Sequence, residues 1–394
     1  MRLSVSSKQA IFLLSVLSGR YIQALASPIR ENLATRNDLE ECADDNDPAE
    51  TDDAPKGNNL PGLGVKFQTG GIVLHSDDCS PEDVASAKGK MINGHKGENW
   101  MLTADTMSDG ELYAEYILNG KKIKLGKGTV KLAAEAAAKD VEVIVENNPY
   151  KWSKQEPEEQ RGGASFIWQP QITAPLPLQG LNDLFGKYLT DGSSCLLSKI
   201  HQKPLIHVTK KFFQPCPNEL GPDAVGERVL GFFSLVLSYT KAADPEKLID
   251  SAVSPKELNP LMPRPDFVSI YKIVKSSIPG NPYDLVKILG SPVPTGQMDR
   301  QRFGIQSEDE EPTFLTVRDW IKSLQESAPD ALTKLDQHID GSIGGLGASF
   351  ENILGSKTMV PLFELRRLRR VKTGEMADFV SKAEKEIISY HQRA

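Results

Sequence analysis

The sequence has few cysteines, no N-glycosylation sequon and no long hydrophobic run beyond its first residues. Its four cysteines, which are Cys42, Cys79, Cys195 and Cys216, form no C-x-x-C pair of the kind that zinc templates use. The apolar run VLGFFSLVL at 229–237 has nine residues, whereas a membrane-spanning helix needs about 20. We therefore expect neither a zinc domain nor a transmembrane segment in the mature chain.

Motifs for cofactor binding and for hydrolysis are also missing. The stretch LNGKKIKLGKGT resembles a phosphate loop, but Gly128 stands where the magnesium-binding Ser or Thr belongs. The stretch GSIGGLG lacks the G-x-G-x-x-G order of dinucleotide-binding loops. Asp340 replaces the first glycine of a nucleophile elbow around Ser342, and H-E-x-x-H does not occur. We expect no cofactor and no metal, and whether the protein is an enzyme stays open.

Residues 1–26 have the composition of a secretory signal peptide. Arg2 and Lys8 supply a positive start, an apolar stretch follows, and Ala24-Leu25-Ala26 matches an A-x-A cleavage site. The alternative is a buried N-terminal helix, but Ser18-Gly19-Arg20 interrupts the apolar stretch. We expect a secreted, extracellular protein.

An even number of cysteines in an exported chain indicates disulfide bonds. Proximity in the sequence favours Cys42–Cys79 and Cys195–Cys216, but three connectivities are possible and proximity does not decide between them. Cys42 lies in a segment that we expect to be disordered, so it can instead be free or removed by processing.

Negative charge is concentrated in one short segment. Asp38 to Asp53 holds nine carboxylates and no basic residue, while the formal net charge of the whole chain is −7. The rest of the mature chain is therefore nearly neutral. An acidic segment repels nucleic acid and a neutral body does not attract phosphate, so we expect no nucleic-acid partner.

Composition and periodicity predict an α+β protein: a small N-terminal α+β domain with a β-hairpin, followed by a larger, mostly helical α+β domain. The expected segments are residues 1–26 (signal peptide), 27–58 (acidic disordered segment or propeptide), 59–150 (small domain), 151–163 (linker) and 164–394 (larger domain). The hairpin is expected at 111–126, where alternating apolar residues flank Asn119-Gly120. Residues 129–147 suit a helix, with 141–145 as a possible strand.

Helices dominate the expected larger domain. The spacing of apolar residues predicts helices at 178–189, from 221 through 239, at 267–274, at 283–289, at 316–324 and at 374–391. Pro170 lies inside the expected strand Phe166 to Thr173, which favours an edge position because proline cannot donate to a β-ladder. A second strand is expected over Val360 to Leu368.

Four charged residues form the candidate site. Arg264 lies between two prolines in MPRPDF, and Asp266 follows, either as the cap of the helix that begins at Phe267 or as a partner of Arg264. In an extended strand Glu364 and Arg366 point to the same, partly apolar face. A charge there needs a partner, so these residues are expected to pair with each other or with Arg264 and Asp266. The cluster is either a structural ion network or a catalytic or ligand-binding site.

A basic run, RRLRRVK, follows the expected strand and contains Arg366, Arg367, Arg369, Arg370 and Lys372. Such charges are typical of a solvated strand edge, where they prevent edge-to-edge pairing. Two alternatives are a surface for anions or membranes and a site that the acidic segment masks until processing.

The chain resembles a family of secreted fungal proteins over most of residues 64–394. The resemblance lies in SDDCSPEDVASAKGKM, ELYAEYILNGKKIKLG, PQITAPLPL, VLGFFSLVLSY, MPRPDFVSIYK, DGSIGGLG and VPLFELR. It implies a fungal, extracellular setting, and it carries no catalytic assignment. The expected function is that of an effector or toxin-like virulence factor with an unknown extracellular target. The alternatives are an extracellular hydrolase and a non-catalytic binding protein.

Overall fold

The computed structural model of the chain shows strands from both halves of the sequence meeting in one sheet. The structure describes residues 60–74, 89–106, 112–147, 151–152, 166–190, 194–197, 226–242, 261–277, 302–307, 310–316, 324, 349–366 and 368–394. The expected signal peptide, the acidic segment and the helices expected at 283–289 and 316–324 lie outside these residues, wholly or for the most part.

Ten strands form the main sheet, and every strand pair in it is antiparallel. Seven of them follow the order β10-β11-β6-β1-β4-β3-β2, while β7 pairs with β11, β12 with β6 and β5 with β1. Their bounds are β1 Gly64–Leu74, β2 Met91–Lys96, β3 Trp100–Thr106, β4 Leu112–Leu118, β5 Lys151–Trp152, β6 Ile167–Pro175, β7 Leu261–Pro263, β10 Phe350–Asn352, β11 Met359–Leu365 and β12 Val371–Lys372. A separate two-stranded sheet joins β8 (Arg302–Ser307) and β9 (Glu310–Thr316).

The expectation of a larger, mostly helical domain is therefore wrong. The described part of residues 164–394 supplies β6, β7, β10, β11 and β12 to the same sheet that β1 to β4 enter from residues 59–150. Even the expected linker contributes β5. The exact domain limits stay a prediction, but the sheet itself is continuous across them.

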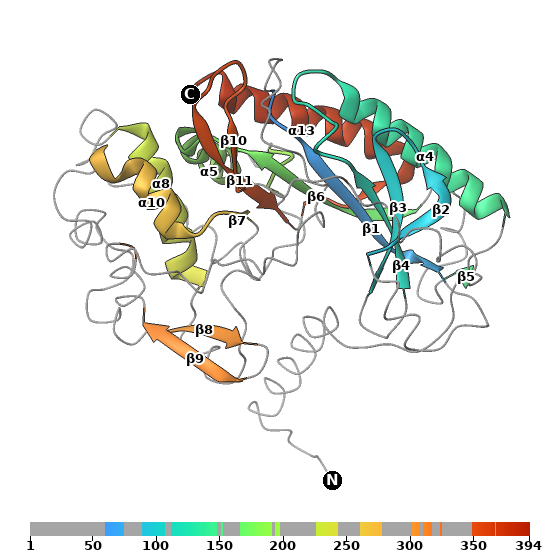
Figure 1. Cartoon of the computed structure of the whole chain (residues 1–394), viewed down its shortest axis with the longest axis horizontal. Coiled ribbons are helices and arrows are strands. Elements are labelled where there is room, and N and C mark those ends of the chain that lie inside the picture. Colours follow the sequence, from blue (N-terminus) through green and yellow to red (C-terminus); the bar gives the residue numbers. More distant parts are fainter. Residues whose placement is uncertain are drawn as a thin grey trace, which may run out of the picture.

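Five α-helices accompany the sheet in the described ranges: α4 Thr129–Asn147, α5 Leu178–Thr190, α8 Glu227–Ala242, α10 Phe267–Val274 and α13 Met376–His391. Two short 3-10 turns, η4 Lys275–Ser277 and η6 Thr373–Glu375, adjoin α10 and α13. Helices α4 and α13 lie side by side across one face of the sheet, and α5, α8 and α10 gather near its β11 end (Figure 1). The possible strand at 141–145 is wrong, because α4 continues through it.

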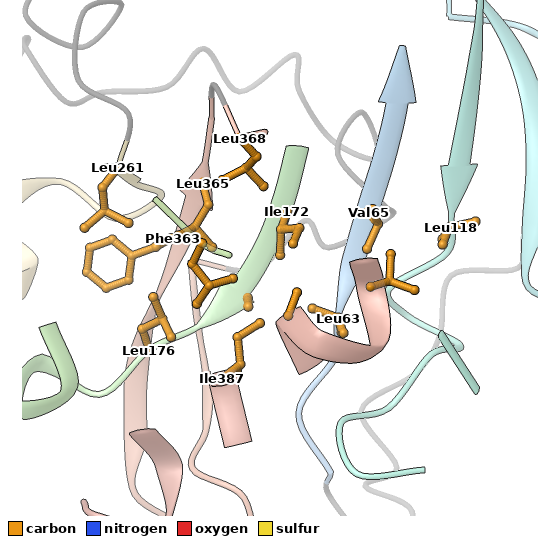
Figure 2. Close-up of a cluster of buried hydrophobic side chains, with 14 of the residues drawn as sticks. Leu63, Val65, Leu118, Ile172, Leu176, Leu261, Phe363, Leu365, Leu368 and Ile387 are labelled. Carbon is orange, nitrogen blue, oxygen red and sulfur yellow. The ribbon is translucent and has the colours of Figure 1, made fainter. Parts of the chain in front are cut away.

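The main hydrophobic core lies between the sheet and α13. Side chains from β1, β6, β11 and α13 converge there, with Val65, Ile172, Phe363 and Ile387 each 0% exposed (Figure 2). Phe67 of β1 meets Phe379 of α13 edge-to-face, with ring centroids 6.5 Å apart. Because side chains alternate along a strand, the residues between these apolar positions point to the opposite face of the sheet.

Strand β6 is central rather than at an edge, since it pairs with β1 on one side and with β11 and β12 on the other. Pro170 is tolerated because β11 pairs with residues 172–175 and β12 with residues 167–168, so neither needs a donor at 170. The side-chain amide of Gln169 bridges the gap by donating to the carbonyl of Leu368 at 2.9 Å.

The expected hairpin at 111–126 does not form. After β4 the chain turns tightly, with the amide of Ile123 donating to the carbonyl of Asn119 at 2.8 Å. The next segment pairs with the chain that leads into β1: Leu63 N donates to Ile123 O, and Leu125 N donates to the carbonyl of Pro61. Strand β4 pairs instead with β1 and β3.

Candidate functional site

The sheet face opposite α4 and α13 carries four buried polar residues, which are Thr103, Glu115, Thr173 and Glu364. We call it the polar sheet face and define it by the register of β11, β6, β1, β4 and β3. Its polar members include Lys66, Gln68, Thr103, Glu115, Gln169, Gln171, Thr173, Glu364 and Arg366. A carboxylate in such a place must be paired or hydrogen-bonded, because desolvation disfavours an isolated charge.

Glu364 lies on β11, the strand at one end of the polar sheet face. Its neighbour across the ladder is Thr173 on β6 on one side and Met262 on β7 on the other. The amide of Arg264 donates to the carbonyl of Leu362 at 2.9 Å, which continues the β7–β11 pairing by one residue. Two separate stretches of sequence are thus brought to the same strand, which is one of the two arrangements that the sequence left open.

Glu364 and the two arginines form an ion cluster that is shielded from bulk water. Arg366 Nε donates to Glu364 Oε1 at 2.5 Å, and Arg264 Nη1 lies 4.0 Å from Glu364 Oε2. The side chains of Glu364 and Arg264 are 1% and 6% exposed, while that of Arg366 is 26% exposed. We call these three residues the Glu364 cluster. Its geometry agrees with either a structural network or a binding site, and it assigns none of the residues to catalysis.

Asp266 is engaged elsewhere, as the N-cap of α10. Its Oδ1 accepts from the amide of Ser269 at 2.7 Å and its Oδ2 accepts from the Ser269 hydroxyl at 2.8 Å. This is the capping role that the sequence offered as an alternative. The cap fixes the start of α10, and through Pro265 it also fixes the position of Arg264 next to β11.

Two buried oxygens, one in the Glu364 cluster and one on the strand beside it, have no hydrogen-bond partner among the described residues. They are Glu364 Oε2 and Thr173 Oγ1, which belong to directly opposed positions on β11 and β6. Glu364 is 1% exposed and Thr173 is 0% exposed. A carboxylate oxygen accepts hydrogen bonds, and a hydroxyl both donates and accepts them. Together with the Arg264 guanidinium, these oxygens can hold a small hydrogen-bonding group, such as a hydroxyl or a water molecule.

A second ion pair on the same face was missed by the sequence analysis. Lys66 Nζ lies 2.8 Å from Glu115 Oε1, and the Thr103 hydroxyl donates to the Glu115 backbone carbonyl at 3.1 Å. The available signal was the acidic residue in the middle of β4, where every position is buried. Glu115 and Glu364 are three strands and four residues apart, about 19 Å from strand geometry. Paired-carboxylate hydrolysis requires less than about 10 Å, so these two do not form such a pair.

Nucleophile and metal chemistry find little support in the described ranges. The Cys195 thiol donates to Glu386 Oε2 at 3.0 Å, and burial, followed by the negative charge of Glu386, raises its pKa. Cys195 carries a free thiol, so the expected Cys195–Cys216 bond is not present, and the other cysteines lie outside the described residues. No group of three or more His, Cys, Asp and Glu side chains in the described ranges is placed to hold a metal ion.

One further polar cluster lies on the helix side of the sheet. His95 Nδ1 on β2 is 3.1 Å from both carboxylate oxygens of Asp140 on α4, and the Tyr116 hydroxyl donates to Asp140 Oδ2 at 2.7 Å. These contacts fasten the β2 end of the sheet to α4. His95 and His391 are the two histidines in the described ranges, and both are held by structural contacts.

Comparison with known proteins adds no family to this geometry: no family model, no curated protein and no solved structure matches the chain. In the part of the chain that the structure describes, no helix combines the length and the apolar character that crossing a membrane requires.

Proposed function

We propose that the protein is exported and acts outside the cell as an effector or toxin-like factor that binds its target at the Glu364 cluster and Thr173, at one end of the polar sheet face. The signal-like composition of residues 1–26 and the resemblance to secreted fungal proteins support export and a fungal, extracellular setting. The target is extracellular and is not nucleic acid, because the chain has no net basic balance.

The observation that carries the binding proposal is the pair of buried oxygens at the Glu364 cluster. Burying a polar atom without a hydrogen bond costs about 1–3 kcal/mol. A fold that keeps two such atoms on directly opposed residues, with Arg264 Nη1 4.0 Å from one of them, suits the recognition of a small hydrogen-bonding group. Binding is favoured over the hydrolase alternative because burial keeps the Cys195 thiol protonated and because Glu115 and Glu364, the buried carboxylates of the polar sheet face, are far apart.

Thr173→Val tests this proposal with little disturbance of the fold. Valine has nearly the shape of threonine, and removing a hydroxyl that lacks a partner is expected to leave stability unchanged or slightly higher. The assay applies culture fluid containing the variant to cells of other organisms and scores growth and death. We expect activity to fall at least about tenfold, which corresponds to the loss of about 1.4 kcal/mol of binding free energy.

The matched control is Thr103→Val, on the same face at the Lys66–Glu115 pair. The Thr103 hydroxyl makes a hydrogen bond, so this variant is expected to lose about 1 kcal/mol of stability and to keep its activity per folded molecule. Full activity of Thr173→Val would overturn the binding proposal. Accumulation of the wild-type protein inside the producing cell would overturn export.

A further inference from the structure

Within the basic run, two buried apolar residues lie on either side of a pair of arginines. Leu368 and Val371 are 0% and 1% exposed, and Arg369 and Arg370, which lie between them, are exposed. The Leu368 carbonyl accepts from Gln169, and Val371 pairs with Trp168 on β6. The two arginines are thus held outward on a backbone that is fixed on both sides.

The charge of this stretch is only partly balanced by its described neighbours. We call Arg369, Arg370 and Lys372 the basic ledge; all three are exposed. Arg369 Nη2 lies 3.9 Å from Glu375 Oε2, a loose pair in which both side chains are about half exposed. A pair of this kind contributes little and is screened by salt. The ledge therefore keeps a net positive charge that can attract an anionic group.

We propose that the acidic segment, Asp38 to Asp53, binds the basic ledge of the same chain and masks it. The segment holds nine carboxylates without a basic residue, which makes it complementary to the ledge. Because it is tethered to the same chain, its effective concentration at the ledge reaches the millimolar range. Many weak pairs can then act together where a single exposed pair would not.

Chain length allows this contact. Gly64 on β1 lies level with Thr173 on β6, and Gln68 lies level with Gln169, which bonds Leu368. The position of the basic ledge differs from that of Leu60 by at most about eight residues along the direction of β1 and by two strands across the sheet. The direct distance between them is therefore about 28 Å. Ten extended residues span about 35 Å, so Glu50 and every carboxylate before it can reach. These are seven of the nine carboxylates.

Zero-length carbodiimide cross-linking of the chain with its acidic segment intact tests the proposal, because this reagent joins a carboxylate to a lysine amine in direct contact. Lys372 reports on the ledge. The matched control is Lys357, an exposed lysine in the β10–β11 turn. That turn lies nearer to the start of β1, since the carboxylate of Glu351 accepts from the amide of Gly62. Tethering alone would therefore favour Lys357.

We expect peptides from 38–53 to be joined to Lys372 more often than to Lys357. The yield at Lys372 should fall at least about threefold between 0.01 and 1 M salt, since the screening length shrinks from about 30 Å to about 3 Å. Replacing Arg369 and Arg370 with glutamine should lower it similarly. Equal cross-link yields at Lys372 and Lys357, or a yield at Lys372 that does not change with salt concentration, would overturn the proposal. So would cross-links that, in a mixture of isotope-labelled and unlabelled protein, join two different molecules.

Discussion

Neutralising Glu364 is the most informative perturbation of this fold. The Glu364→Gln variant keeps the shape of the side chain but removes the charge that Arg264 and Arg366 share. Arg264 is 6% exposed, so its positive charge is then left in a desolvated place, whereas Arg366 at 26% exposure can hydrate in part. Breaking a buried ion pair on one side costs about 3–5 kcal/mol. The remaining amide oxygen can still accept from Arg366, which places the expected loss near 3 kcal/mol.

Urea unfolding followed by tryptophan fluorescence and circular dichroism measures this loss as a shift of the midpoint. The matched control is Glu375→Gln, because that carboxylate is 49% exposed, its ion-pair partner Arg369 lies 3.9 Å away, and a glutamine oxygen can still accept from the amide of Lys372. An exposed pair contributes at most about 1 kcal/mol. Adding Arg264→Met to Glu364→Gln should restore at least about 1 kcal/mol, since no unpaired buried charge then remains. A loss from Glu364→Gln no larger than that from the control would refute the account of the cluster.

Three more results are expected. Gly231→Ala should cost about 3 kcal/mol, because an added Cβ would lie 1.7 Å from the carbonyl oxygen of Leu178 and push α8 away from α5; thermal unfolding measures this. His391 accepts from Leu354 N and donates to Pro175 O, and burial lowers its pKa. Stability should therefore fall as pH drops below about 6.5, by at most about 1.4 kcal/mol per pH unit, and less steeply in His391→Gln. Cys195 should resist iodoacetamide at pH 8, as peptide mass mapping would show, because its raised pKa keeps the thiol protonated.

Each of these predictions has its own control. Gly374→Ala introduces a Cβ that meets nothing within 4 Å, so it should change the melting temperature little. The sign for His391 follows from the unfolded chain binding a proton that the folded chain excludes, and equal pH slopes in the two proteins would contradict it. Unfolding in urea should make Cys195 reactive, and rapid labelling of the native thiol would show that it is not held by Glu386.

Local signals in the sequence predicted individual elements well. The helices α5, α10 and α13 lie within about two residues of their expected bounds, and Asp266 caps α10. The pairing of strands was harder to predict. The alternation of apolar and polar residues shows which side chains of a strand are buried, but it does not show which other strand is the partner. Ile123 and Leu125 are both 0% exposed, as the hairpin pattern required, yet the segment pairs with residues 61–63.

The mostly helical larger domain failed for a related physical reason. Strands such as β7, β10 and β12 have two or three residues each, too short for a periodicity signal, and their stability comes from neighbours far away in the sequence. At the site, the alternation of side chains along a strand indicated that Glu364 and Arg366 share one face. The need of a buried charge for a partner indicated Arg264 as a neighbour, and Arg264 lies 4.0 Å from Glu364. Thr173 and the Lys66–Glu115 pair could not be found this way. Thr173 meets Glu364 only through the register of β6 and β11, and Lys66 meets Glu115 only through the register of β1 and β4.

A crystal structure at a resolution that shows ordered water tests the central claim most directly. The account predicts that in the free protein Glu364 lies between Arg264 and Arg366, shielded from bulk solvent, and that an ordered water touches both Glu364 Oε2 and Thr173 Oγ1 in the place that a hydroxyl of the target would take. A carboxylate that lies open in a water-filled cleft, with Arg264 turned away from it, would contradict the account.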